Sequence, residues 1–126
     1  MGLTHSEVEI ENLFTSRKLT VKSLVDSGAV FLSVPQHVAL QLGFDPDEVA
    51  TREVVLAKGQ RVEAPMIGPL RVRFANRYCD LSAWVLGDEP LLDAVPMEMM
   101  DLVLHPATQT LSVNPDSPYV PTALAK

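Results

Sequence analysis

The residues best suited to chemistry lie in one short segment, residues 24–29, with the sequence Leu-Val-Asp-Ser-Gly-Ala. Asp26 follows an apolar stretch typical of a buried strand end, and a Ser-Gly turn follows it. We therefore expect its carboxylate to be held rigidly. Gly28 lets the backbone double back closely, and the hydroxyl group of Ser27 can hydrogen-bond across to a neighbouring loop.

The same segment has a simpler interpretation, because Asp, Ser and Gly are all common in turns that close a hairpin. An Asp-Ser/Thr-Gly tripeptide is expected by chance in about one chain in fifteen of this length. The tripeptide alone therefore does not decide between a reactive carboxylate and an ordinary turn.

Other reactive side chains form no comparable pattern. His5, His37 and His105 lack the spacing of paired metal ligands. Cys79 lies in an expected strand with no histidine pattern near it, which is typical of a small buried hydrophobe. The glycines are isolated, so no phosphate-binding loop is present. We expect neither a metal site nor a cofactor.

Composition narrows the classes of partner. The chain has 126 residues, 47% of them hydrophobic, and a net charge of −6 from 10 basic and 16 acidic residues. An acidic chain without a basic stripe is a poor binder of nucleic acid or anionic membranes. No apolar run approaches the ~20 residues that span a bilayer. A single cysteine fits a reducing compartment, so we expect one cytoplasmic domain.

The elements that must position Asp26 are mostly short strands. Polar and apolar residues alternate in several segments, and β-branched residues are enriched in others. Strands are predicted at residues 6–12, 19–25, 54–56, 61–62, 70–74, 78–86, 102–104 and 110–113. A helix is predicted over 35–42 with Gly43 as its cap, and helical turns over 91–94 and 97–100.

Short strands separated by turns at this spacing predict an all-β sandwich or barrel with one or two short helices. Residues 1–114 are expected to form the domain. Residues 115–126 contain three prolines and are expected to form a tail that runs extended over the surface or a partner.

Taken together and in order, these segments resemble the retropepsin-like aspartic proteases of clan AA, and more closely their small bacterial single-domain members. The resemblance extends from about Val8 to Val113. Its parts are residues 24–29, the Val-Pro-Gln-His-Val-Ala-Leu-Gln-Leu-Gly helix at 34–43, the Leu-Ala-Lys-Gly-Gln hairpin tip at 56–60, and Val-Leu-Gly at 85–87 with Leu91-Leu92 after it. It implies a closed β-barrel or sandwich of the acid-protease half-lobe type.

The resemblance also implies a role for each matching residue. Asp26 matches the catalytic aspartate. The active-site loop around it is formed by Ser27, Gly28 and Ala29. The flap that closes over substrate is formed by Leu56, Ala57, Lys58 and Gly59. The segment that supports the aspartate loop is formed by Val85, Leu86 and Gly87. Retroviral members have an ion pair where this chain has Val30 and Asp88, so we expect the dimer to be braced differently.

Aspartic protease chemistry needs two carboxylates that share one proton: one activates water, and the other donates a hydrogen bond to the scissile carbonyl. The chain contains one such motif and is too short for two lobes. We therefore expect a site on a two-fold axis, with Asp26 from each of two chains.

The leading hypothesis is thus a homodimeric aspartic endopeptidase that acts on peptides or proteins without a cofactor. Two alternatives stay open. One is a retropepsin-fold dimer that binds peptides or a partner and turns over poorly. The other is a small β-domain in which the Asp-Ser-Gly turn is incidental.

Overall fold

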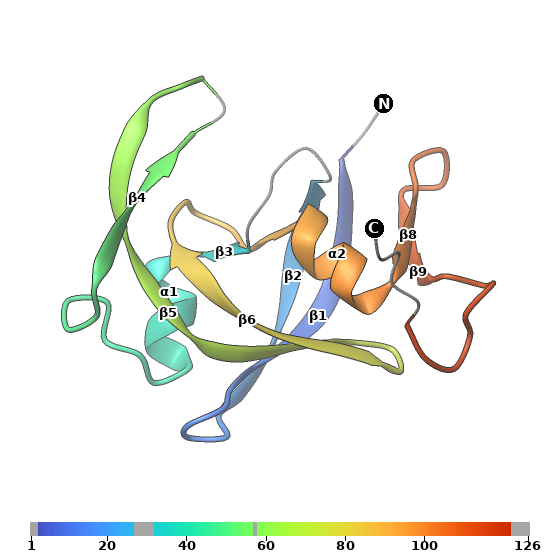
Figure 1. Ribbon diagram of the computed structural model, residues 1–126, viewed down its shortest axis with the longest axis horizontal. Coiled ribbons are helices and arrows are strands. Elements are labelled where there is room, and N and C mark those ends of the chain that lie inside the picture. The colour runs from blue at the N-terminus through green and yellow to red at the C-terminus, as the bar shows by residue number, and fades with distance from the viewer. Residues whose placement is uncertain (1–2, 27–31, 57, 122–126) are drawn as a thin grey trace, which may run out of the picture.

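The chain folds around a β-sheet that closes on itself within the residues that the computed structural model describes, 3–26, 32–56 and 58–121. Six strands follow one another around this barrel, and β1 pairs with both β2 and β5 to complete the ring (Figure 1). In order around the ring, they are β1 (Thr4–Asn12), β2 (Lys18–Asp26), β7 (Leu91–Asp93), β3 (Ser33–Val34), β6 (Arg77–Val85) and β5 (Arg61–Phe74). The barrel confirms the predicted all-β fold class.

The first two strands form because polar and apolar residues alternate along them. Val8 on β1 pairs with Val21 on β2, and both side chains are buried. One position earlier on β1, Glu7 pairs with Lys22, and both are exposed. Apolar side chains on the inner face fill the barrel, among them Val8, Ile10, Val21, Val25, Leu32, Val34, Leu70, Val72 and Leu92.

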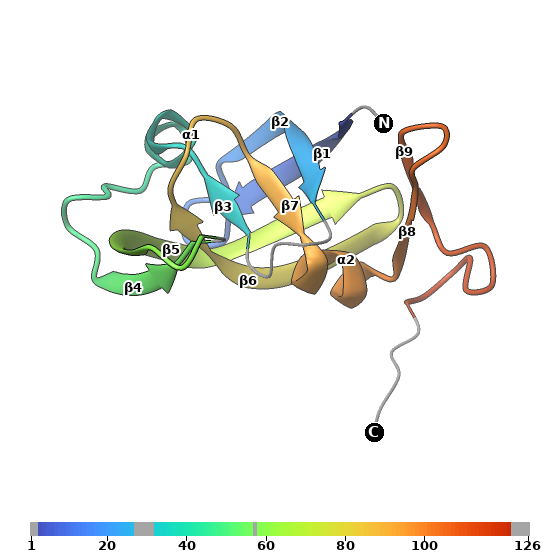
Figure 2. The same ribbon diagram turned by 90° about the horizontal axis from the view of Figure 1, so that it is seen from above.

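The short strand β7 differs from the sequence-based prediction of a helical turn over 91–94, which is wrong. Leu91–Asp93 lies between β2 and β3, parallel to β2 and antiparallel to β3 (Figure 2). These neighbours provide backbone partners that a helical turn could not use: the N–H of Leu24, for example, donates to the carbonyl of Pro90 at 2.9 Å. Tertiary pairing therefore overrides the local preference of a Leu-rich segment.

A long hairpin extends from the barrel. β4 (Thr51–Val55) pairs with the first part of β5, and Val55 lies opposite Arg61 across the predicted tip. The register of β5 against β6 shifts between Ile67 and Leu70. Glycine is required at position 68, because a Cβ atom there would lie 2.6 Å from the hydroxyl oxygen of Ser82. Beyond this shift β5 belongs to the barrel.

Two helices and a second hairpin complete the described chain. α1 (Gln36–Gln41) follows Pro35 as predicted, and Gly43 just beyond it has a φ of +90°. α2 (Ala94–Met100) follows β7 directly and includes the predicted turn at 97–100. β8 (Leu102–His105) and β9 (Thr110–Val113) form the hairpin predicted near the C-terminus.

Arg77, at the start of β6, is a fully buried basic side chain that joins three parts of the chain. Its guanidinium group donates to the carbonyl oxygen of Met100 at 3.1 Å and to that of Ser117. Nearby, the amide of Asn76 donates to the carbonyl of Pro118 at 2.9 Å. The first residues of the predicted tail are therefore hydrogen-bonded to the β5–β6 turn.

Candidate active site

Asp26 is the last residue of β2, and its side chain is exposed. Val25 immediately before it is buried in the core, so the end of the strand is anchored while the carboxylate faces outward. The remaining predicted active-site loop residues, Ser27, Gly28 and Ala29, lie outside the described residues. Their predicted roles stay predictions.

A second carboxyl group that sequence reasoning missed lies directly beside Asp26. Asp93 is the register partner of Asp26 in the parallel pairing of β2 with β7. Its side chain is fully buried, at 0% exposure. Asp93 is also the N-cap residue of α2, yet its side chain makes no capping hydrogen bond. Within the described part of the chain, neither of its carboxyl oxygens has a hydrogen-bond partner.

These surroundings raise the pKa of Asp93 from 3.8 to about 7. Burial is the main cause, because a desolvated carboxylate is disfavoured relative to its neutral acid. The backbone N–H of Asp93 opposes the rise in pKa, while the negative charge of Asp26 adds to it. The chain thus places an exposed carboxyl group beside a buried one that retains its proton into the neutral range.

The predicted support segment contacts the strand that leaves the aspartate loop. The N–H of Leu86 donates to the carbonyl of Val34 at 2.9 Å, and Val85 is the parallel register partner of Val34. Gly87 lies in the exposed turn beyond β6, with a φ of +81°. The strand that pairs with Asp26 itself is β7, the Leu-Leu-Asp segment six residues further along.

The predicted flap is the tip of the β4–β5 hairpin, which projects from the barrel in Figure 1. The N–H of Leu56 donates to the carbonyl of Gln60, and the N–H of Gly59 donates to that of Leu56, both at 2.8 Å. Gly59 has a φ of +84°, which favours glycine. Lys58 is exposed at the tip, and Ala57 lies outside the described residues.

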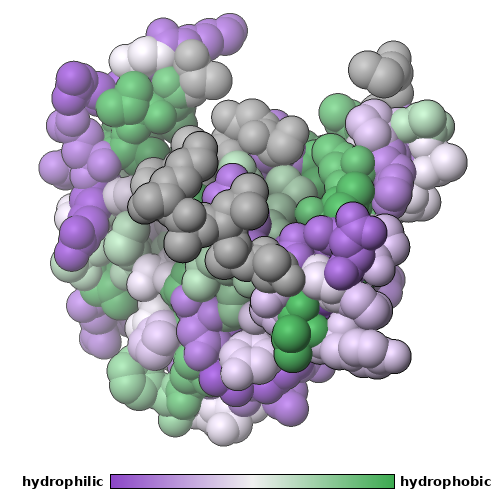
Figure 3. Space-filling view, turned by 45° about the vertical axis from the view of Figure 1, so that its right-hand side comes forward, coloured by the Kyte–Doolittle hydropathy of each residue, from purple (hydrophilic) through white to green (hydrophobic). Residues whose placement is uncertain are grey.

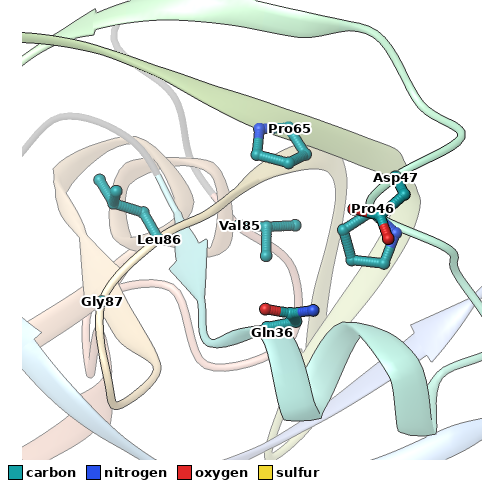
Figure 4. Close-up of a pocket in the computed structure, with 7 residues that line it drawn as sticks. All are labelled: Gln36, Pro46, Asp47, Pro65, Val85, Leu86 and Gly87. Atoms are coloured by element: carbon teal, nitrogen blue, oxygen red, sulfur yellow. The ribbon is translucent and has the colours of Figure 1, made fainter.

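A pocket of about 320 Å³ lies between the predicted support segment, residues 85–87, and the base of the β4–β5 hairpin (Figure 4). Val85, Leu86 and Gly87 form one wall, and Pro65 of the hairpin strand β5 lies across from them. The start of α1 and the loop before β4 complete the lining with Gln36, Pro46 and Asp47. The pocket therefore places the end of β6 near the base of the hairpin, although Asp26 does not line it.

Among the described residues, no group of three or more His, Cys, Asp or Glu side chains is arranged to hold a metal ion. None of the helices there is long and apolar enough to cross a membrane.

Comparison with solved structures identifies the fold. The chain is similar to the retroviral protease-like domain of Ddi1 from Leishmania major, with a TM-score of 0.64 and 18% identity over 91% of this chain and 90% of that one. It is also similar to a retropepsin-like aspartic protease from Rickettsia conorii, with a TM-score of 0.50 and 21% identity over 81% and 85%. No family model and no curated protein matches the sequence. The fold is therefore retropepsin-like.

Proposed function

We propose that the protein is an aspartic endopeptidase that works as a homodimer. The observation that carries this proposal is the place of Asp26 in a retropepsin-like barrel, at the exposed end of β2 where β7 pairs with it. A single chain offers one such exposed aspartate in this motif. A two-fold axis beside Asp26 would bring the equivalent aspartate of a second chain to it and complete the dyad.

In this mechanism one Asp26 is ionised and the other protonated. The carboxylate takes a proton from a water molecule, whose oxygen attacks the scissile carbonyl carbon, while the protonated partner donates a hydrogen bond to the carbonyl oxygen. A tetrahedral diol forms. Its collapse breaks the C–N bond, the amine nitrogen accepts a proton, and one proton stays on the dyad, so protons and charge balance over the cycle.

The substrate is proposed to bind as an extended strand under the flap formed by Leu56, Ala57, Lys58 and Gly59. Backbone hydrogen bonds would supply most of the affinity in this binding mode, and pockets for alternate side chains would supply specificity. The pocket between Pro65 and Val85 is a candidate for such a subsite, because it lies at the base of the hairpin and has both apolar and polar residues in its lining.

A second function is favoured by one observation, the buried acid beside Asp26. Asp93 adds a carboxyl group close to the dyad, and above about pH 7, where this group is ionised, its negative charge opposes ionisation of the catalytic base. A retropepsin-fold dimer that binds peptides or a partner without efficient turnover is the corresponding alternative.

The test is cleavage of a peptide library by the purified protein, with and without pepstatin. Asp26→Asn is nearly isosteric and removes the ionisable group, so we expect it to reduce cleavage at least about 10³-fold while the fold is retained. The matched control is Asp116→Asn, the same substitution at an exposed site near the C-terminus, and it is expected to cleave like the wild type. Peptide binding without cleavage would favour the second function, and equal cleavage by Asp26→Asn would overturn the first.

A further inference from the structure

Asp93 places a second carboxyl group beside Asp26 within the same chain. The two residues are register partners on adjacent parallel strands, which lie about 4.8 Å apart in a β-sheet. Side chains at paired positions project from the same face of a sheet. The carboxyl groups of Asp26 and Asp93 are therefore neighbours by the construction of the barrel, before any second chain is added.

The surroundings of Asp93 favour its neutral form. The side chain is fully buried, its two oxygens have no hydrogen-bond partner among the described residues, and it does not cap α2. An ionised carboxylate without partners in such a position is strongly disfavoured. The same position would suit an acid that keeps its proton, and burial raises its pKa to about 7.

The charged groups on the elements packed against β7 provide no counter-charge that would favour ionisation. Asp26 is the charge on β2 that acts on Asp93, and it raises the pKa. The lysines of β2 lie further back along the strand, where Lys18 and Lys22 pair with Glu11 and Glu7 of β1. The described strand β3, Ser33–Val34, has no charged residue. The remaining acidic groups nearby in the chain are exposed: Asp88, Glu89 and Glu98.

We propose that Asp93 is a positioning residue for the reaction proposed above, on which this inference rests: it serves as a proton reservoir that keeps the Asp26 site protonated toward neutral pH. When the shared proton of the dyad has been lost to solvent between turnovers, Asp93 gives its own proton through a bridging water to an oxygen of Asp26. Asp93 is left as a carboxylate and regains a proton from a hydronium ion of the solvent. Each transfer breaks one O–H bond and forms another, so the dyad again holds the single proton that the cycle requires.

The first arm of the test is the pH profile of kcat/KM for peptide cleavage between about pH 4 and 8. Wild type is expected to lose activity as the pH rises past about 7. Asp93→Asn cannot store a proton, so its decline should begin at lower pH and its activity at pH 7, relative to its own maximum, should be about tenfold below that of the wild type. Asp116→Asn is the control. Identical normalised profiles for wild type and Asp93→Asn would overturn the inference.

The second arm does not depend on cleavage or on folding of an Asp93 variant. The side-chain carboxyl ¹³C resonance of Asp93 is followed by NMR against pH in the wild type and in Asp26→Asn. We expect a midpoint near 7 in the wild type and a lower midpoint in Asp26→Asn, because a neighbouring negative charge has been removed. If the wild type cleaves no peptide, the proposed function fails and the role of Asp93 in that reaction fails with it, while this measurement still decides whether Asp93 holds a proton near neutral pH. If the wild type does cleave, an Asp93 midpoint in the ordinary aspartate range overturns the inference alone.

Discussion

Asp26 and Asp93 occupy paired positions on adjacent strands but meet opposite surroundings. The Asp26 side chain is exposed at the end of β2, whereas Asp93 is closed off from solvent. The same residue type therefore has different chemistry at the two positions, because burial penalises charge at Asp93 alone. Pairs of acids in contrasting environments are typical of sites in which one group acts as base and the other as acid.

Burial of Asp93 makes the stability of the fold depend on pH. Its pKa in the folded protein, about 7, is raised above the ordinary value of 3.8, so the folded state holds this proton more tightly than the unfolded state. The resulting stability is fully present below about pH 4 and is lost as the pH rises through about 7. Asp93→Asn should remove this loss. We expect the variant to gain on the order of 4 kcal/mol over wild type between pH 4 and pH 8.

Urea unfolding at a series of pH values measures this difference, and Asp116→Asn serves as the matched control because its side chain is exposed. Its curve is expected to run parallel to that of the wild type. A constant difference between Asp93→Asn and wild type across the pH range would show that the buried acid does not titrate between the folded and unfolded states.

The two acids also show how far a site can be predicted from sequence. Asp26 was identified because the Ser-Gly turn after an apolar strand is a local signal. Asp93 was missed because its burial arises from β2, β3 and α2 packing around a three-residue strand. The sequence signal for Asp93 was weak: it is an aspartate that follows two leucines and precedes a helix.

At the scale of the elements, the β4–β5 hairpin is the part least supported by its surroundings. β4 pairs with β5 alone among the described strands, and four of its five residues are exposed. Val55, near the tip, exposes 56% of its surface. Few apolar contacts oppose its opening, which is the property that a flap over a substrate site requires.

We therefore expect the backbone amides of β4 to exchange hydrogen for deuterium at least about tenfold faster than those of β2. The comparison is internal, since β2 is paired on both edges, with β1 and β7. Binding of pepstatin should slow exchange in β4 and leave β2 unchanged. Exchange in β4 as slow as in β2 would contradict the assignment of this hairpin as a flap.

Most elements could be predicted because their signals are local. Alternation of polar and apolar residues predicted β1, and enrichment in β-branched residues predicted β2. A proline followed by apolar residues at helical spacing predicted α1. The segment Leu91–Asp93 could not be predicted in this way. It contains no β-branched residue and no alternation, and it is a strand because β2 and β3 provide hydrogen-bonding edges on both sides.

For the whole molecule, the proposed function requires two copies. Figure 3, in which the β8–β9 side turns toward the viewer, shows apolar patches separated by polar residues rather than one broad apolar face. Each copy has a net charge of −6, so association brings like charges together. The dissociation constant of a dimer built around the Asp26 positions should therefore depend on the charge of the two Asp26 carboxyl groups at its centre.

We expect sedimentation velocity to show a dimer whose dissociation constant falls by about tenfold, or 1.4 kcal/mol, between pH 8 and pH 5. Asp26→Asn should dimerise at pH 8 at least as tightly as wild type, because it removes the negative charge of the dyad from the axis. Asp116→Asn removes negative charge at an exposed site elsewhere and serves as the control. A monomer at high concentration throughout this pH range would rule out the shared dyad.

Closure of the barrel through β1 also sets the order in which a nascent chain can assemble. β1 is synthesised well before β5, yet Glu9 of β1 forms an ion pair with Arg73, 64 positions later on β5. Until β5 emerges from the ribosome, β1 and β2 form a ribbon with open edges, and open edges are templates for pairing with other chains. Pairing over such a long sequence separation is intrinsically slow. Aggregation during synthesis, and the need for chaperones, should therefore be concentrated in the interval between completion of β2 and arrival of β5.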